Sequence, residues 1–407
     1  MKPETSPNAS QPSREAGAAL TPSEIAERAR EHGRIAIDTE FVSEGRYRPL
    51  LCLVQVAVAP REANGEPEIE VLDPIEGFDH EPLAELLADP EVEIVFHAGG
   101  QDVPILRRAW GVGPTNVFDT QVAAGFAGFS AQAGYGNLLA RVSGVQLSKS
   151  AGFTRWDRRP LTREQLEYAR SDVEDLLALS DTLQERLEKA GRLGWAREEC
   201  RRLEGLDDER DADEAYRRLP RVNRLRPRQR AVAYALADWR ERTAATEDRP
   251  VGSVLSDVAL VEVARRQPES VDALSAIRGV RPDLGRRRGA AILDVIRDGR
   301  DLEPPVAEES TRPEPDPSDA ARIALCESVV RQRVGEAGLA YELVASRADL
   351  TEIVVSARAG RDEPEVRTLR GWRRDLVGDE LLELLAGRRS VRATAAGVAV
   401  EPAGGDA

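Results

Sequence analysis

The chain is poor in the residues that would support a small secreted fold or a membrane span. Its 407 residues include only three cysteines, Cys52, Cys200 and Cys326. Their number and wide spacing exclude a disulfide framework and a cysteine-based zinc cluster. The longest apolar run, from Leu50 to Ala59 with Gln55 inside it, falls well short of the roughly 20 residues that cross a bilayer. We therefore expect no membrane association and a location in the reducing cytoplasm.

Aromatic side chains are also scarce, at 4%, so the cores must rest on aliphatic residues. Lys and Arg number 57 against 72 Asp and Glu, and the formal net charge is −15. This acidic balance argues against a protein that coats DNA, but it permits a locally basic groove. The hydrophobic content of 41% and the charged content of 32% are typical of a globular protein. The length suits two or three domains.

Two acidic stretches divide the chain. Residues 198–214 hold nine acids against three arginines, and residues 301–319 hold seven acids and five prolines. We interpret the first as an acidic connector over 201–217 and the second as an extended, proline-rich linker over 300–318. The polar N-terminus at 1–20 is expected to be a disordered leader. Three folded regions remain, at 21–200, 218–299 and 319–400.

The first region alternates strand and helix signals. Apolar runs predict strands at Arg34–Phe41, Leu50–Ala59, Ile69–Leu72 and Val92–Phe96. Helices are expected at 81–88 and 103–109. Three adjacent strands followed by strand–helix alternation indicate an α/β fold with a mixed sheet. The second and third regions show helical patterns without convincing strands, and both are predicted to be small all-α bundles; in the third, helices are expected at 319–335, 346–357 and 365–385.

Two acids, Asp38 and Glu40, stand two residues apart in the first predicted strand. Side chains alternate between the faces of a strand, so both acids point away from the face of Ile35 and Ile37. Two carboxylates about 7 Å apart repel each other unless they are solvated or bridged by cations. Strand centres also disfavour Asp. The pair is therefore either a metal site or the solvated face of an edge strand.

A third acid, Asp102, follows a turn that contains Gly99 and Gly100. The glycines would let the backbone pass close to a ligand. His97 and Gln101 offer polar contacts in the same turn, although either side chain could instead satisfy local backbone groups. The alternative for Asp102 is an ordinary helix N-cap.

A fourth acid lies on a helix that begins after Thr162, where Gln165 completes a capping box. Tyr168 and Asp172 are spaced four residues apart on this helix and therefore share one face. They could place a metal-binding carboxylate beside a phenol that holds a water molecule. The alternative is a tyrosine at the edge of the apolar stripe beside a solvated aspartate.

In this order, the four acids and Tyr168 resemble the exonuclease sites of the DEDD superfamily, in the variant with Tyr in the last motif. The surrounding stretches resemble the ribonuclease D family at Ile37–Phe41, Leu51–Gln55, Phe96–Gly99, Phe118–Gln121, Leu147–Ser150 and Trp156–Thr162. This resemblance covers about 30–190 and implies an RNase H-like fold with 3′→5′ exoribonuclease activity. Residues 219–299 resemble the helical HRDC domain, and residues 318–400 resemble a degenerate second module of that kind.

The resemblance also implies a cofactor, two divalent cations that are either Mg²⁺ or Mn²⁺. Asp38 would bridge both cations, Glu40 and Asp172 would complete the first, and Asp102 would support the second. Tyr168 would orient the attacking water. The expected substrates are RNA 3′ ends such as those of tRNA precursors, and the products are nucleoside 5′-monophosphates. A DNA 3′→5′ exonuclease and a catalytically silent nucleic-acid-binding scaffold are the alternatives.

Substrate contacts are expected in a strip of seven arginines without acids over residues 217–230. Such a strip can bind phosphates, or it can be the solvated face of an arginine-rich chain. Its candidate residues are Arg221, Arg224, Arg226 and Arg228. Lys149 lies in a loop similar to that of the family and is a candidate contact for the substrate backbone. Phe41 could stack on the terminal base or belong to the core. We expect the protein to be a monomer.

Overall fold

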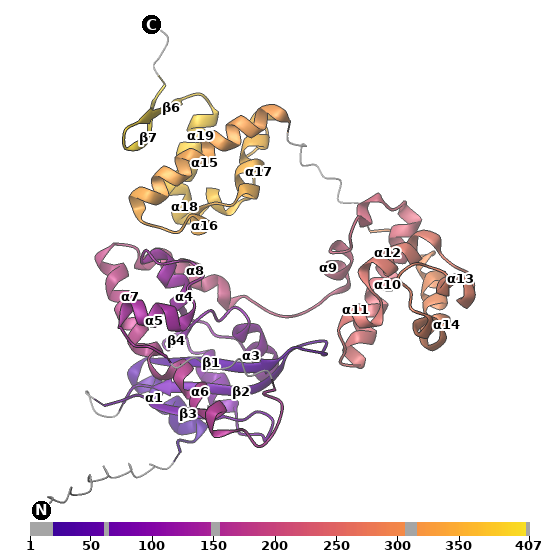
Figure 1. The fold of residues 1–407 in the computed structure, drawn as a ribbon, viewed down its shortest axis with the longest axis horizontal. Helices are drawn as coiled ribbons and strands as arrows, with labels where there is room; N and C mark the ends of the chain where they lie inside the picture. The colour runs from indigo at the N-terminus through magenta and orange to yellow at the C-terminus, as the bar shows by residue number, and fades with distance from the viewer. Residues whose placement is uncertain (1–18, 61–64, 148–154, 306–315, 404–407) are drawn as a thin grey trace, which may run out of the picture.

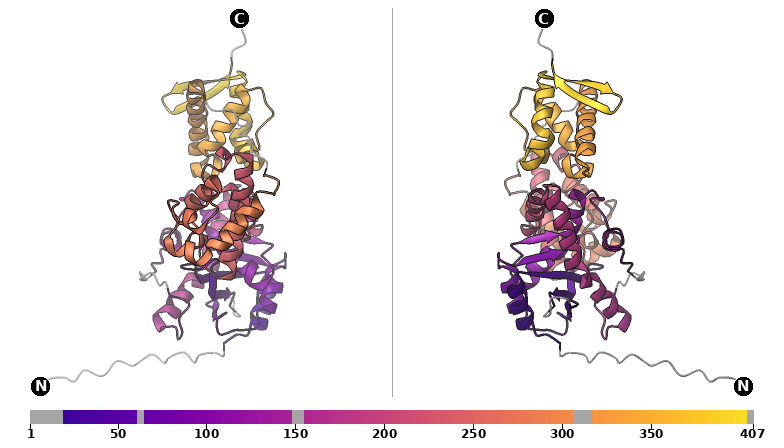
Figure 2. Two further views of the ribbon diagram at one scale, coloured as in Figure 1. Left: turned by 90° about the vertical axis from the view of Figure 1, so that its right-hand side faces the viewer. Right: turned by 90° about the vertical axis from the view of Figure 1, so that its left-hand side faces the viewer.

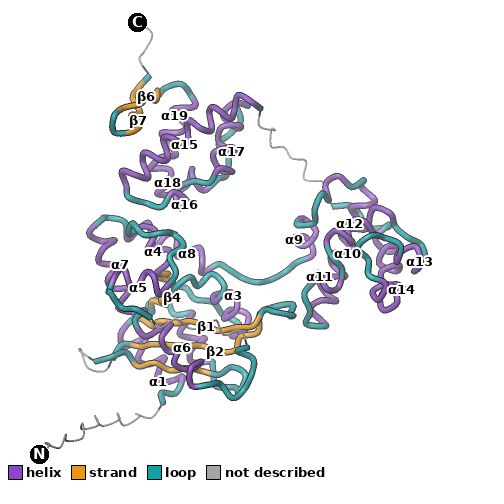
Figure 3. Tube along the Cα trace, in the orientation of Figure 1, coloured by secondary structure: helices purple, strands orange, loops and turns teal. Residues whose placement is uncertain are grey.

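The computed structural model describes residues 19–60, 65–147, 155–305 and 316–403 (Figure 1). Three folded parts follow one another along the chain. We refer to them as the nuclease-like domain (19–204), the HRDC-like domain (212–299) and the C-terminal domain (316–403). Figure 3 shows that the large sheet belongs to the first of these and that the other two are built mainly from helices.

The nuclease-like domain is organised around a five-stranded sheet with the order β3-β2-β1-β4-β5. The strands are β1 (Arg34–Val42), β2 (Leu50–Val58), β3 (Glu68–Leu72), β4 (Glu93–Phe96) and β5 (Val117–Asp119). β1 pairs antiparallel with β2 and parallel with β4, so the predicted mixed sheet is confirmed. The sequence does not predict β5, because three residues are too few to show a strand pattern.

Helices cover both faces of this sheet. On one face, α1 (Pro22–His32), α2 (Glu81–Leu87) and α3 (Asp102–Trp110) bury the side chains of Ile35 and Ile37. On the other face, α6 (Arg163–Glu174) and α7 (Leu176–Lys189) pack on Ala36 and Ala57. Three more helices extend the domain: α4 (Thr120–Phe126), α5 (Tyr135–Val142) and α8 (Leu193–Glu204).

The HRDC-like domain is a helical bundle, as predicted. Its helices are α9 (Ala212–Arg217), α10 (Pro227–Thr246), α11 (Val251–Val254), α12 (Asp257–Arg266), α13 (Val271–Ser275) and α14 (Pro282–Gly299), with the 3-10 turn η1 (Val222–Arg224) before α10. The acidic stretch expected as a connector contributes the end of α8 and all of α9. Asp211 caps α9 by accepting a hydrogen bond from the backbone of Glu214. Acids favour a helix N-terminus, so part of this stretch folds as a helix.

The C-terminal domain is mostly helical and ends in a hairpin. Its elements are α15 (Pro317–Ala337), α16 (Tyr341–Val344), α17 (Arg347–Arg358), η2 (Arg367–Leu369), α18 (Gly371–Arg373), η3 (Arg374–Gly378), α19 (Asp379–Leu385), β6 (Arg389–Thr394) and β7 (Gly397–Pro402). The single helix expected at 365–385 is therefore broken into short pieces. The hairpin contradicts the expectation that this region lacks strands. Only Val391 and Val400 pack against the core, so its apolar pattern is weak.

The two helical domains contact the nuclease-like domain differently. The C-terminal domain shares a continuous apolar core with α4, α5, α7 and α8, and Figure 2 shows it stacked above them. The Trp372 ring stacks on Trp195 with centroids 5.1 Å apart. The HRDC-like domain contacts the loop between β1 and β2, where the Tyr47 hydroxyl donates a 2.9 Å hydrogen bond to Glu241. No helix in the described ranges is long and apolar enough to cross a membrane.

Candidate active site

Asp38 and Glu40 lie on β1, the central strand of the sheet, and both are partly buried. Their face is the one on which Ala36 packs beside Val173 of α6, whereas Ile37 belongs to the core on the opposite face. The alternative of a solvated edge strand therefore does not hold for β1. The strand directs two carboxylates into the space beneath α6.

Asp172 and Tyr168 reach the same space from α6. The helix begins with the predicted capping box, in which Gln165 N donates to the Thr162 hydroxyl (3.2 Å) and Thr162 N donates to the Gln165 side chain (3.0 Å). The Tyr168 hydroxyl donates a hydrogen bond to the Asp172 carboxylate. The Tyr168 ring lies against Trp156 with centroids 6.0 Å apart. Asp172 thus holds the Tyr168 hydroxyl, and Trp156 packs against the Tyr168 ring.

Asp102 is the first residue of α3 and is only 7% exposed. Its carboxylate accepts a 2.5 Å hydrogen bond from the Thr39 hydroxyl, which lies on β1 between the first two acids. The N-cap position belongs to Gln101, whose side chain makes no capping bond. The alternative of an ordinary N-cap is therefore wrong for Asp102. Its side chain is directed to β1 instead.

The turn before Asp102 is held by Asp119, to which the sequence assigns no role beyond the family resemblance of Phe118–Gln121. The Asp119 carboxylate accepts hydrogen bonds from the backbone N–H groups of Ala98 (3.2 Å) and Gly99 (2.8 Å) and also caps α4. A Cβ at Gly99 would approach the Phe96 side chain to 2.8 Å, while nothing lies within 4 Å of a Cβ at Gly100. Packing on Phe96 therefore explains Gly99. The available signal for Asp119 was its position as a cap between a short apolar strand and a helix.

The four carboxylates of Asp38, Glu40, Asp102 and Asp172, which we call the carboxylate cluster, all have raised pKa values. Burial is the largest cause for each of them. The charges of the other three carboxylates further raise the pKa of Asp38 well above its usual value. The pKa of Glu40 rises to about 8, that of Asp172 to about 7 and that of Asp102 to about 6. Like charges shift one another in this way only at close range.

Within the described ranges, no arginine or lysine forms an ion pair with the carboxylate cluster. Nor are any three Asp, Glu, His or Cys side chains there grouped tightly enough to hold a metal ion as they stand. The oxygen donors and the lack of a protein counter-charge fit hard divalent cations such as Mg²⁺ or Mn²⁺.

Other predicted contact residues have different surroundings. His97 uses both ring nitrogens inside the protein, with the Thr120 hydroxyl at 2.9 Å and the Ala133 carbonyl at 3.1 Å, and burial lowers its pKa. Gln101 is exposed, and half-buried Phe41 packs against the core beneath the sheet. Lys149 lies outside the described residues.

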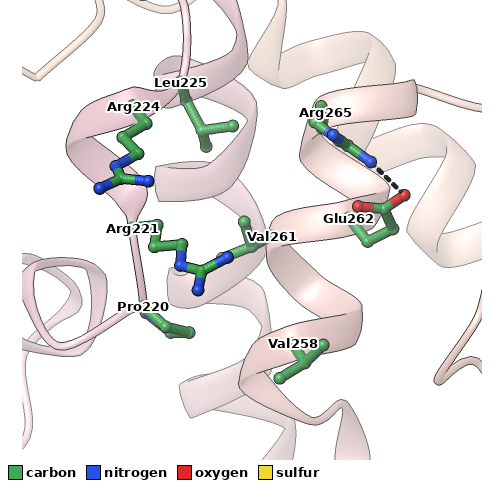
Figure 4. A pocket seen from close by; sticks show the side chains of 8 residues that line it. All are labelled: Pro220, Arg221, Arg224, Leu225, Val258, Val261, Glu262 and Arg265. Atoms are coloured by element: carbon green, nitrogen blue, oxygen red, sulfur yellow. Dashed lines mark hydrogen bonds and ion pairs between the residues drawn. The ribbon is translucent and has the colours of Figure 1, made fainter.

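Two of the predicted arginines, Arg221 and Arg224, line a cavity of about 680 Å³ in the HRDC-like domain (Figure 4). We call it the arginine pocket; its lining residues are Pro220, Arg221, Arg224, Leu225, Val258, Val261, Glu262 and Arg265. Glu262 pairs with Arg265 at 2.7 Å, whereas the other two arginines have no acidic partner in the described part of the chain. Arg226 and Arg228 are exposed beside the pocket but do not line it. The carboxylate cluster lies in a different domain.

Comparison with protein families divides the chain in the same way. A 3′-5′ exonuclease model matches residues 18–188, and an HRDC domain model matches residues 229–296. The crystal structure of Escherichia coli RNase D, described as an exoribonuclease involved in structured RNA processing, superposes with a TM-score of 0.75 at 29% identity. That alignment covers 90% of this chain and 96% of the other.

Curated relatives give the same result over almost the full length. Ribonuclease D of Gluconacetobacter diazotrophicus is 38% identical over 370 residues, which is 89% of this chain and 90% of the relative. Ribonuclease D of Acidiphilium cryptum is 35% identical over 368 residues, covering 88% and 89%. On these matches, and on an α/β exonuclease domain followed by an HRDC domain, the chain belongs to the ribonuclease D family.

Proposed function

We propose that this 3′→5′ exoribonuclease hydrolyses the terminal phosphodiester bond with two divalent cations, Mg²⁺ or Mn²⁺, held by the carboxylate cluster. The observation that supports this best is a set of four buried or half-buried acids without a cationic partner among the described residues. When bound, such cations activate a water and stabilise charge on the leaving 3′-oxygen. The products are nucleoside 5′-monophosphates released singly.

The four acids of the carboxylate cluster are positioned by different elements of the fold. Asp38 and Glu40 present their oxygens from one rigid strand, and Asp172 closes the site from α6. Asp102 is oriented by the Thr39 hydroxyl and supports the site from the start of α3. Because strands and helices are more rigid than loops, the backbone positions of the four acids are set before cations and substrate bind.

Tyr168 is suited to orienting water and unsuited to removing its proton. Burial and the neighbouring acids raise the pKa of the phenol above its usual value of 10.0, so it stays protonated at neutral pH. Its proton is directed to Asp172. The phenol oxygen can accept a hydrogen bond from the attacking water and fix its approach to the phosphorus.

The arginine pocket is the proposed contact for the RNA backbone. Arg221 and Arg224 face solvent, and their guanidinium groups can bind phosphates without breaking an ion pair. Apolar Val258, which is 68% exposed, and Val261 form an adjacent surface for a base or ribose. We propose structured RNA with a free 3′ end, in particular tRNA precursors, as the substrate class.

A degradation assay on end-labelled RNA and DNA of the same sequence, with and without EDTA, tests the proposal. We expect stepwise 3′ shortening of RNA that stops in EDTA and returns with Mg²⁺ or Mn²⁺. Faster shortening of DNA than of RNA would favour a DNA exonuclease. Binding without shortening would identify a catalytically silent scaffold.

A further inference from the structure

Gln55 is a buried amide that lacks a partner in the described structure. It lies on β2 and is 0% exposed, and neither its Nε2 nor its Oε1 has a hydrogen-bond partner among the described residues. Its strand is paired on both sides, with β1 and with β3. Buried side-chain amides are nearly always satisfied in native proteins. Two unsatisfied atoms on one side chain therefore indicate a partner that joins the site from outside or moves into reach.

The strand pairing around Gln55 points to a candidate for that partner. Gln55 stands directly opposite Asp38 in the antiparallel β1–β2 pair, so both side chains lie on the same face of the sheet. The residue opposite on the other neighbouring strand is Val71, and the same-face positions along β2 are Leu53 and Ala57. These three side chains are apolar. Among these strand neighbours, the carboxylate of Asp38 is the group that can accept a hydrogen bond from the amide.

We infer that Gln55 is a positioning residue for the cation site: its amide donates a hydrogen bond to the Asp38 carboxylate once cations have drawn the carboxylate cluster together. This inference rests on the proposed cation site and adds a residue to it. A carboxylate that binds cations through one oxygen needs a donor at the other to stay oriented, and outer partners of this kind commonly contribute about 10–100-fold to metal affinity. Without cations, the amide remains unsatisfied beneath α6.

The inference predicts opposite effects on stability and on metal affinity in one variant. Gln55→Met keeps the volume and removes both polar atoms. In the metal-free protein we expect Tm to stay the same or to rise by about 2–4 °C, because no hydrogen bond is lost and a buried unsatisfied amide is removed. Affinity for Mn²⁺, measured by calorimetry on the full chain, should fall by about 10–100-fold. Leu53→Met, at the next position on the same face, is the matched control and should change neither quantity appreciably.

The outcomes separate this inference from the proposed function. If the unsubstituted protein binds no Mn²⁺, or if Asp38→Asn binds it equally well, the cation site itself is wrong. If Asp38→Asn abolishes binding and Gln55→Met binds as the unsubstituted protein does, the site stands and the role of Gln55 is overturned. A metal-free Gln55→Met protein that is clearly less stable, or that fails to fold, would show that the amide already has partners and would also overturn it.

Discussion

The molecule encloses carboxylates in several places, and two of these places stabilise them in opposite ways. At the junction with the C-terminal domain, Glu199 accepts a 2.7 Å hydrogen bond from Arg373, a residue that is 0% exposed, and a second from Trp372. Burial would raise the pKa of Glu199, but Arg373 outweighs it and the pKa is lowered. At Asp38 and Glu40 of the carboxylate cluster, burial and like charges act together and raise the pKa values.

The difference separates a structural acid from a functional one. A buried carboxylate that stabilises a fold comes with its own cation, as Glu199 does, or with backbone N–H donors, as Asp119 does, since an unpaired charge is costly to bury. The carboxylate cluster has no such counter-charge in the described ranges. Burying its charges therefore costs free energy of folding, and an external cation would remove that cost. Perturbed acids that gather in this way are typical of functional sites.

The largest effect on activity should come from Asp38→Asn. We expect turnover of RNA to fall by at least about 10³-fold, because the residue shared by the proposed cations is neutralised. The metal-free Tm should be equal or higher, since one repelling charge is removed. The control is Glu174→Gln, an exposed acid on α6. A folded Asp38→Asn protein with full activity would remove Asp38 from the site.

The matching substitution at the paired site, Glu199→Gln, should do the reverse. It leaves Arg373 buried without a full counter-charge, and we expect a loss of about 3–5 kcal/mol in the free energy of unfolding. The rate per folded molecule should remain unchanged, because Glu199 belongs to the junction of two domains. Thermal unfolding and RNA degradation would be measured together, with exposed Glu185→Gln as the control. Undiminished stability would contradict the role assigned to this pair.

Tyr168→Phe should have an intermediate effect. We expect kcat to fall by about 10–100-fold while Mn²⁺ affinity stays within a few-fold, since the phenol orients water and does not hold the cations. Tyr234→Phe in the HRDC domain is a control for the loss of a phenol distant from the site. Unchanged turnover would show that the Tyr168 hydroxyl serves the structure alone.

The two sites should also differ in how pH affects stability. Glu40 and Asp172 bind protons more readily in the folded protein than in the unfolded chain, with pKa values of about 8 and about 7. Unfolding therefore releases protons. The stability that Glu40 and Asp172 contribute at low pH is lost as pH rises from about 4.5 to about 8. Glu199, with its lowered pKa, contributes stability above the unfolded pKa and loses it as pH falls.

Tm measured in EDTA across this pH range checks the sign. We expect a decline toward pH 8 that Asp38→Asn makes shallower, because the remaining acids then repel less. Saturating Mg²⁺ should reduce the decline, since cations bind the ionised form. A variant without the Glu199–Arg373 pair lacks the opposing contribution of Glu199. If the metal-free Tm of this variant still rises steadily toward pH 8, the raised pKa values of Glu40 and Asp172 are contradicted.

The smallest effect should be on RNA binding, from substitutions in the arginine pocket. Here the unpaired side chains are cations, whereas those of the carboxylate cluster are anions. Arg221→Ala and Arg224→Ala should each reduce the dependence of log Kd for single-stranded RNA on log salt by about 0.7. Arg331→Ala, which removes an arginine that is already paired with Glu327, should leave the dependence unchanged. An equal effect of all three would mean that the pocket has no special role.

Much of the nuclease domain could be predicted because its signals are local. Alternation along β1 was sufficient to place Asp38 and Glu40 on one face, and a capping box was sufficient to locate the start of α6. The remaining features depend on distant partners. Arg373 meets Glu199 across 174 residues of sequence, and no local pattern predicts that contact.

Gln55 illustrates the same limit within the site. In the sequence it is one polar residue in an apolar run, and its importance depends on the register that sets it opposite Asp38. The Arg217–Arg230 strip shows the converse. Its composition was evident, but the pocket that selects Arg221 and Arg224 requires α12 to pack beside it.

The most direct test of the account is a crystal structure of the protein with Mn²⁺, read from the anomalous signal of the metal. We predict two ions, about 3.5–4 Å apart, coordinated by oxygens of Asp38, Glu40, Asp102 and Asp172, with these side chains drawn closer than in the metal-free protein. Crystals that contain Mn²⁺ elsewhere while these four carboxylates remain apart and unoccupied would contradict it.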